Sequence, residues 1–431
     1  MKVYFETYGC TLNKADTALM KSILVKAGHE IVDDAGKADV IVINTCTVRK
    51  DTEDRILRRI KKLYNLTIKN GKKFIIAGCM VSAQPYTLRK IAPNASLVSP
   101  QNIVKIKEVV EASNNLYLIL GERDTNYLET YIEGVTAAIP IAEGCLGDCS
   151  FCIVKIARRR LRSYKPELIL KVVREAVSRG VIEVDLTAQD TASYGIDLGG
   201  PRLHELINMI VGSIPEKFYI RIGMANPDTL IDILDDVIEV LKHPKVYKYM
   251  HIPLQSGDDK VLKLMNRKYT YDEYKSIIKE LRRKIPEITI ATDIIVGHPG
   301  EDEEAFQNSI KAVKELMFDK VHLAQYTLRP RTEAAAMPQI PDPIKKERSK
   351  ILTKVIEGVG FRINKDYIGS HALTVVTQRS FRGGIAGRTI NYKPVVIYGN
   401  DFRGVHLGSE IYVRIVQATF YDLRGRPLKW L

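Results

Sequence analysis

The sequence predicts an α/β protein with an N-terminal parallel sheet, a central partial (βα)6 barrel and a small C-terminal all-β barrel. Strand and helix patterns alternate up to about residue 326, which is the order of parallel βα units. Beyond residue 366, short β-like runs are separated by Gly, Asn-Asp and Arg-Gly turns, which is typical of a small barrel. The length of 431 residues suggests two or three domains, and we expect them at residues 1–120, 131–365 and 366–431.

The first part alternates strands with amphipathic helices. Strands are expected at residues 2–7, 39–44 and 74–77, and helices at residues 13–27, 48–64 and 83–91. The strand at 39–44 is a short, largely β-branched apolar run, the pattern of a parallel strand buried on both faces. Successive units of this kind predict a parallel sheet covered by helices.

The middle of the chain repeats the alternation six times. Strands are expected at residues 137–142, 182–187, 218–223, 249–253, 288–296 and 321–326, with helices that include 166–179, 228–241 and 303–316. Six βα units indicate a barrel or partial barrel. Reactive residues then belong at the C-terminal ends of the strands.

The last part changes in composition. A connector rich in Pro and Ala (327–343) leads to a helix at about 343–362, and strands follow at residues 371–377, 395–398 and 410–419. Residues 366–431 hold nine Lys and Arg against four Asp and Glu. The whole chain carries a net charge of +14, which suggests a polyanionic partner such as nucleic acid.

The composition, 45% hydrophobic and 27% charged, is that of a soluble globular protein. No apolar run approaches the ~18 residues of a membrane span, and the N-terminus has no secretory signal pattern, so we expect a cytoplasmic protein without a membrane partner. Stable disulfides are rare there, so the six cysteines are expected to be ligands, catalysts or buried apolar residues.

Three of the cysteines form a local motif. Cys145, Cys149 and Cys152 follow the pattern C-x3-C-x2-C in CLGDCSFC, just after the first strand of the central part. Three thiolates can bind one metal centre and leave one position open, and soft thiolates favour iron–sulfur clusters, zinc or Cu(I). A structural zinc site would need a fourth ligand, and no nearby His or Cys supplies one.

The other three cysteines are far apart in sequence but occupy equivalent places. Cys10, Cys46 and Cys79 each end or directly follow a predicted strand of the first part. Parallel strands end at one edge of a sheet, where ligand sites of open α/β folds lie, so the three thiols should meet. Any one of them alone is better explained as a buried apolar cysteine. Together they favour a second cluster site.

These motifs resemble those of the methylthiotransferases, a family of radical S-adenosylmethionine (SAM) enzymes, over essentially the whole chain. The octet CLGDCSFC resembles the radical-SAM cluster motif, including the aromatic Phe151 before the last cysteine. The first part resembles the family's cluster-binding domain in GCTLN (9–13), NTC (44–46) and GC (78–79). The central part adds LTAQDT (186–191), HIPLQSG (251–257), LKLMNR (262–267) and TDIIVGHPGE (292–301). The tail, with GRTINY (387–392), resembles the TRAM domain, an OB-like RNA-binding barrel.

The resemblance implies two [4Fe–4S] clusters and SAM as cofactors. One cluster would be held by Cys145, Cys149 and Cys152 with SAM on its open iron, and an auxiliary cluster by Cys10, Cys46 and Cys79. SAM contacts would come from Phe151, Gln189, Asp190, Ser256, Gly257 and Asp293. A radical breaks an unactivated carbon–hydrogen bond that a protein base cannot, so no side chain is assigned to acid–base catalysis. An electron donor and a sulfur source, whose identities the sequence does not give, are also implied.

The substrate implied by the family is either a modified adenosine beside the tRNA anticodon or an aspartate of a ribosomal protein. A basic run at 155–165 follows the cluster motif without an acidic residue, and the excess positive charge favours RNA. RNA contacts are expected from Arg158, Arg159, Arg160, Arg162, Arg388 and Lys393. A solvated basic face explains the run equally well on its own.

Among the tRNA enzymes, LTAQD (186–190) and DDKVL (258–262) most resemble the archaeal and eukaryotic type. That type acts on N6-threonylcarbamoyladenosine and methylthiolates carbon 2. Isopentenyladenosine tRNA and the ribosomal-protein aspartate remain alternatives within the enzyme class. A non-catalytic iron–sulfur RNA-binding protein is the alternative of another class.

Overall fold

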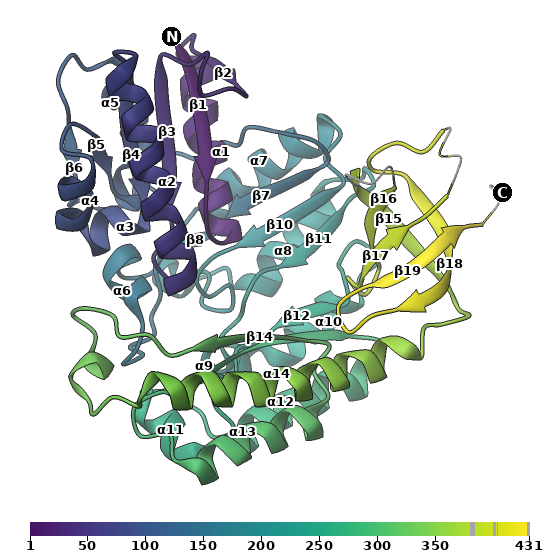
Figure 1. Cartoon of the computed structure of the whole chain (residues 1–431). Coiled ribbons are helices and arrows are strands. Elements are labelled where there is room, and N and C mark those ends of the chain that lie inside the picture. Colours follow the sequence, from purple (N-terminus) through teal and green to yellow (C-terminus); the bar gives the residue numbers. More distant parts are fainter. Residues whose placement is uncertain (380–383, 400–401, 403, 429–431) are drawn as a thin grey trace.

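The computed structural model describes residues 1–379, 384–399, 402 and 404–428. Figure 1 shows three bodies: a sheet with helices at the N-terminus (purple and dark blue), a central set of strands and helices (teal to green), and a small β-barrel (yellow). No helix among these residues is both long and apolar enough to span a bilayer. The α/β class and the all-β tail predicted from the sequence are confirmed.

The N-terminal sheet has the order β2-β1-β3-β4-β5-β6 and is parallel throughout. Its strands are β1 (Lys2–Thr7), β2 (Glu30–Val32), β3 (Val40–Thr45), β4 (Lys73–Gly78), β5 (Ser96–Val98) and β6 (Tyr117–Leu118). The helices are α1 (Thr11–Lys26), α2 (Lys50–Lys69), α3 (Cys79–Ala83), α4 (Pro85–Ile91) and α5 (Ile106–Glu111), with a 3-10 turn at Pro100–Lys105. Side chains of β3 enter separate apolar clusters on the two faces of the sheet, Ile41 and Ile43 on one and Val40 and Val42 on the other.

The central part is an open run of six parallel strands. β7 (Thr136–Pro140), β10 (Glu183–Thr187) and β11 (Tyr219–Ile222) form one half, and β12 (Tyr249–His251), β13 (Thr289–Val296) and β14 (Lys320–Gln325) form the other. Isolated parallel bridges, Ile220 with Val246 and Met224 with His251, join β11 to the β12 side. The predicted partial (βα)6 barrel is therefore confirmed. A short hairpin of β8 (Ala142–Glu143) and β9 (Arg162–Ser163) follows β7.

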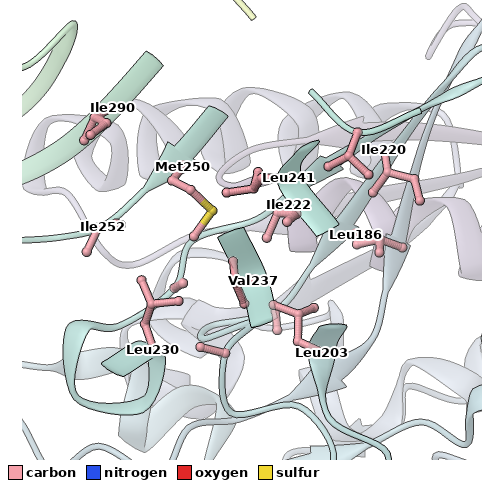
Figure 2. Close-up of a cluster of buried hydrophobic side chains, with 14 of the residues drawn as sticks. Leu186, Leu203, Ile220, Ile222, Leu230, Val237, Leu241, Met250, Ile252 and Ile290 are labelled. Carbon is pink, nitrogen blue, oxygen red and sulfur yellow. The ribbon is translucent and has the colours of Figure 1, made fainter. Parts of the chain in front are cut away.

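Helices cover the outside of this barrel. They are α6 (Ile153–Arg158), α7 (Pro166–Ser178), α8 (Leu203–Ser213), α9 (Pro227–Leu230), α10 (Leu234–Lys242), α11 (Asp259–Leu264), α12 (Tyr271–Lys284), α13 (Glu303–Leu316) and α14 (Asp342–Lys365), with 3-10 turns at Ile196–Leu198, Ile231–Ile233 and Glu333–Ala336. Apart from α6, which contacts α3 of the N-terminal part, these helices meet the strands through their apolar stripes in one large core, part of which is drawn in Figure 2. In that view Leu203, Val237 and Leu241 of the helices lie beside Ile222 and Met250 of the strands. This packing fixes the strand ends that carry the site.

The C-terminal barrel is closed in the order β15-β16-β17-β19-β18. Its strands are β15 (His371–Arg379), β16 (Ile385–Thr389), β17 (Pro394–Ile397), β18 (Glu410–Ala418) and β19 (Leu423–Pro427). It docks on the N-terminal ends of the central strands, where Val375 and Tyr392 pack with the tyrosines of β11 and β12.

The segment between β14 and α14 contacts the N-terminal part directly. Arg329 donates to Glu53 Oε2 at 2.6 Å and to the Val48 carbonyl at 2.8 Å, and Arg331 donates to the Ala83 carbonyl at 2.7 Å. The predicted connector (327–343) therefore also links the central barrel to the N-terminal part through hydrogen bonds of Arg329 and Arg331. At a second contact between the two parts, α1 packs against β7, the edge strand of the open barrel.

Candidate active site

The first cysteine triad lies at one edge of the N-terminal sheet. Cys46 and Cys79 directly follow β3 and β4, and Cys10 lies three residues after the end of β1; the three strands are neighbours in the sheet. The Asn13 side-chain oxygen lies 3.9 Å from Cys10 Sγ and 3.8 Å from Cys79 Sγ. A Cβ atom on Gly9 would lie 2.7 Å from Cys46 Cβ, so the chain before Cys10 passes close to Cys46. The structure thus brings together the three thiols as predicted from their positions.

A buried arginine reaches this triad from the central part. Arg158, at the end of α6, places Nε 3.4 Å from Cys79 Sγ and donates to the Asn13 side-chain oxygen at 2.6 Å. It also pairs with Asp16 at 2.7 Å and with Glu143 at 2.8 Å. The basic run predicts Arg158 to bind RNA, and this prediction is wrong, because the side chain is 1% exposed and its donors are already engaged.

The network around Arg158 extends further into the interface. Asp16 also accepts from Arg123 at 2.9 Å, and Arg123 donates to the Tyr164 hydroxyl at 2.8 Å and to the Pro100 carbonyl at 2.6 Å. Buried charges are stable only when paired and hydrogen-bonded, and this set meets both conditions. The network therefore holds the N-terminal sheet against the barrel next to the first triad.

The second triad lies on the loop between β8 and α6. The Gly147 amide donates to Cys145 Sγ at 3.2 Å, and a Cβ atom on Gly147 would lie 3.3 Å from Cys145 Sγ and 3.8 Å from Cys149 Sγ. Arg267 Nη1 lies 3.2 Å from Cys149 Sγ, and Asn226 Nδ2 lies 3.9 Å from Cys145 Sγ. This loop therefore wraps its thiols around one point beside the partly buried cation of Arg267.

Burial favours the protonated form of four of the six thiols in the protein without metal. It raises the pKa of Cys79 and of Cys145 to about 12 and the pKa of Cys152 to about 11, and it also raises the pKa of Cys46. Metal binding requires thiolates, so loading of either site must release protons. Arg158 and Arg267 supply the positive charge that an anionic iron–sulfur group needs, and three thiols leave one ligand position open. Both donor sets fit such a group.

Three of the predicted SAM contacts lie close to the second triad. Gln189 accepts from the Gly144 amide at 2.8 Å, one residue before Cys145. Asp190 accepts from the Asn226 amide at 2.9 Å and from Thr229 at 2.7 Å, and burial raises its pKa to about 6. Phe151 packs edge-on against the buried His298 ring.

The other three predicted SAM contacts have different surroundings. The Gly257 amide donates to Ser309 of α13 at 3.0 Å, and a Cβ on Gly257 would lie 2.6 Å from the Asn308 carbonyl oxygen. Ser256 is 1% exposed and lies 3.5 Å from the Ser309 hydroxyl. Both residues are used to pack their loop on α13. Asp293 faces His251 at 3.1 Å inside the barrel, and His251, Asp293 and His322 hold polar atoms within 4.8 Å of one another.

The remaining basic residues divide between surface and interior. Arg159, Arg160 and Arg162 line a cavity of about 620 Å³ beside the second triad's helix, and Arg159 and Arg160 are exposed. Lys393 was predicted to bind RNA, and the structure contradicts this, because it is 3% exposed and bonded to Asp319 and Asn364. Arg388 is half-buried over the Tyr392 ring.

A second cavity of about 620 Å³, here called the interdomain cavity, lies where the three bodies meet. Thr11 and Lys14 line it from the N-terminal part, and Arg388 and Tyr392 from the terminal barrel. The central strands contribute Asp185, Arg221, Tyr249, His251, Lys320 and His322. Thr11, which lines the interdomain cavity, is the residue after Cys10.

Several site residues have no signal in the sequence that would single them out. Asp16 and Glu143 are ordinary acidic residues until the fold places Arg158 between them. Asn13 and Arg267 lie within the quoted motifs, which marks their segments but not their contacts with sulfur. Asn226 precedes α9 and shows no pattern at all.

Comparisons with known proteins agree with this geometry. The Radical SAM superfamily model matches residues 139–313, and the model described as uncharacterized protein family UPF0004 matches residues 2–99. The superfamily implies a [4Fe–4S] cluster and SAM. Among solved structures, the radical SAM methyltransferase TsrM from Kitasatospora setae, with cobalamin and a [4Fe-4S] cluster bound, shares the fold. Its TM-score is 0.57 at 12% identity, over 78% of this chain and 77% of that chain.

Curated relatives match nearly the whole chain. The probable threonylcarbamoyladenosine tRNA methylthiotransferase of Methanocaldococcus jannaschii is 40% identical over 99% of this chain and 96% of that protein. The human threonylcarbamoyladenosine tRNA methylthiotransferase is 33% identical over 99% of this chain and 74% of its own length. With two cysteine triads in place, the chain belongs to the threonylcarbamoyladenosine tRNA methylthiotransferase family of radical SAM enzymes.

Proposed function

We propose that this enzyme methylthiolates carbon 2 of N6-threonylcarbamoyladenosine next to the anticodon of tRNA. The observation that carries the proposal is the pairing of two three-cysteine sites through Arg158, which lies six residues after Cys152 and contacts Cys79. One site alone would suffice for radical formation. The second, held at a fixed place by a buried ion network, supports a reaction that also inserts sulfur.

The cofactors we propose are two [4Fe–4S] clusters and SAM, with Cys145, Cys149 and Cys152 holding one cluster and Cys10, Cys46 and Cys79 the other. When bound, these groups supply the radical that breaks an unactivated carbon–hydrogen bond and the sulfur that replaces the hydrogen.

The chain's own residues orient the reactants and balance charge. Arg158 and Arg267 lie against the two triads, where their guanidinium groups offset thiolate charge. Gln189 and Asp190 fix the backbone around the second triad through bonds to Gly144 and Asn226. Helix α1 of the N-terminal part packs on β7 at the edge of the barrel and so positions the first triad relative to the barrel.

For RNA binding we propose the exposed arginines beside the second triad and the terminal barrel. Arg159, Arg160 and Arg162 line a cavity next to α6, where phosphate groups of the anticodon arm would be neutralised. We assign cluster binding to residues 1–120, radical chemistry to residues 131–365 and TRAM-type RNA binding to residues 366–431. The enzyme also needs an electron donor and a sulfur source, and its tRNA substrate implies a cytoplasmic location.

Nucleoside mass spectrometry of tRNA from a deletion strain tests the proposal. We expect the 2-methylthio form of threonylcarbamoyladenosine to disappear while the unmodified precursor accumulates. Loss of 2-methylthio-isopentenyladenosine instead would favour the other tRNA substrate. Unchanged tRNA with an unmethylthiolated ribosomal protein would favour the aspartate. Unchanged methylthiolation of both tRNA and the ribosomal protein would favour the non-catalytic iron–sulfur RNA-binding protein.

Iron content tests the second cluster separately. Anaerobic reconstitution should give about eight irons per chain. Cys46→Ala should remove about half of that iron and leave reductive cleavage of SAM intact. Full iron content in this variant would mean that the first triad holds no cluster.

A further inference from the structure

The interdomain cavity has a surplus of positive charge. Six Lys and Arg side chains line it against three carboxylates, Asp185, Asp319 and Glu357. Two of these carboxylates are already matched: Asp319 is bonded to Lys393, and Asp185 lies 3.6 Å from Arg221. A cavity with this balance favours an anionic ligand over a metal ion or an apolar group.

Two of the cations are ready to bind such a ligand. Among the described residues neither Lys320 nor Arg388 forms an ion pair with a carboxylate, and both are half-buried. Each is held over a tyrosine ring, Lys320 at 5.0 Å from the centre of Tyr421 and Arg388 at 4.9 Å from that of Tyr392. Cations fixed in this way lose little conformational freedom when they bind an anion.

The walls also hold polar atoms without hydrogen-bond partners. Within the described part of the chain, Arg221 Nε, Asp185 Oδ1 and Thr289 Oγ1 are buried without a hydrogen-bond partner, although Asp185 Oδ1 lies 3.6 Å from Arg221 Nη1. His251 Nε2 lies 3.1 Å from Asp293 Oδ2, in a geometry that does not make a hydrogen bond. These residues make the wall polar, which suits a ligand with donors and acceptors better than a hydrocarbon.

We propose, resting on the proposed function, that the interdomain cavity binds the threonylcarbamoyl group on N6 of the substrate adenosine and that Lys320 and Arg388 bind its carboxylate. This substituent carries one carboxylate, a hydroxyl and an N–H···carbonyl unit, which match the charge and the polar wall. An isopentenyl group carries none of these. The cavity therefore selects between the two modified adenosines, and Thr11, the residue after Cys10, lies in its lining.

Three anticodon stem-loop RNAs that differ only at N6 test this inference. They carry the threonylcarbamoyl acid, its methyl ester, which is nearly the same size but uncharged, or the isopentenyl group. Fluorescence anisotropy with the full chain should give about 10- to 100-fold tighter binding of the acid than of the ester, the value of a charge-assisted hydrogen bond.

Substitutions at Lys320 and Arg388 test whether these two residues cause the preference for the acid RNA. Lys320→Met and Arg388→Met should each weaken binding of the acid RNA about 10-fold and change the ester RNA less than about twofold. Lys320→Arg and Arg388→Lys keep the charge and should keep the preference for the acid. Lys314→Met, on α13 and outside the interdomain cavity, is the matched control and should change neither affinity.

Equal affinity of the wild type for acid and ester would overturn the inference. It would also fail if Lys320→Met and Arg388→Met weakened both RNAs equally, because the two residues would then contact the phosphate backbone. Failure of the proposed function looks different. The reconstituted enzyme would then bind the acid RNA in preference to the ester and still add no methylthio group to it.

Discussion

Replacing Arg158 by Met tests whether the buried ion network holds the N-terminal sheet on the barrel. The guanidinium bonds to Asp16 at 2.7 Å, to Glu143 at 2.8 Å and to Asn13 at 2.6 Å, with 1% of the side chain exposed. Methionine keeps much of the volume but none of the donors. The variant therefore isolates the charge and hydrogen bonds from the packing.

The expected cost follows from the partners that remain. Asp16 keeps its bond to Arg123 at 2.9 Å, so only Glu143 is left as a buried carboxylate without a cation. Breaking one buried ion pair costs about 3–5 kcal/mol, and we expect that loss in the free energy of unfolding. Urea denaturation followed by far-UV circular dichroism measures it through the transition midpoint and slope.

Two further variants decide the interpretation. Arg159→Met is the matched control: its side chain is exposed, bonds only to the Gly121 carbonyl, and should cost less than about 0.5 kcal/mol. Adding Glu143→Met to Arg158→Met should recover most of the loss, because the orphaned charge is then gone. A loss below about 1 kcal/mol in Arg158→Met, or no recovery in the double variant, would refute the reasoning.

Three other outcomes are expected. Gly78→Ala should lower the stability of the protein and the amount of iron bound by the first triad. The reason is that Gly78 has φ +93° and that an added Cβ would lie 2.2 Å from the Asn44 side-chain oxygen. The melting temperature and an iron assay measure the two effects. Burial raises the pKa of Glu301 to about 7, above its unfolded value, so this group adds stability at low pH that is lost as pH rises towards 8. Urea midpoints should therefore fall less between pH 5 and 8 in Glu301→Gln. Replacing Arg159, Arg160 and Arg162 by Gln should weaken tRNA binding. Filter binding across salt concentrations should then show a salt dependence that is flatter by about 0.9 per lost phosphate contact.

Strands were predicted correctly where burial requires a short run of apolar residues in the sequence. The three longer strands of the N-terminal sheet and all six of the central barrel were predicted, because each is a short run with apolar residues bounded by turns. β2, β5 and β6 were missed because they have only two or three residues. The helix expected at 228–241 is divided into α9, a 3-10 turn and α10, since apolar periodicity does not report breaks in backbone hydrogen bonding.

The positions of the cysteines were predictable and the arginine beside the first triad was not. The first triad could be predicted from three strand ends, and the second from the local spacing C-x3-C-x2-C. A basic run does not reveal which side chain turns inward. Arg158 ends α6 and Arg159 has φ 64°, so the backbone changes direction there, and two consecutive arginines have opposite environments, one buried and one exposed.

The contrast between the two triads has a consequence for how the enzyme matures. Cys145, Cys149 and Cys152 lie on one short loop, so their thiols are near one another in any compact form of that segment. Cys10, Cys46 and Cys79 meet only after β1, β3 and β4 have paired, which closes long stretches of chain between them. The first triad can therefore hold the proposed cluster only after the N-terminal sheet has folded, whereas the second triad's loop needs no such long-range pairing.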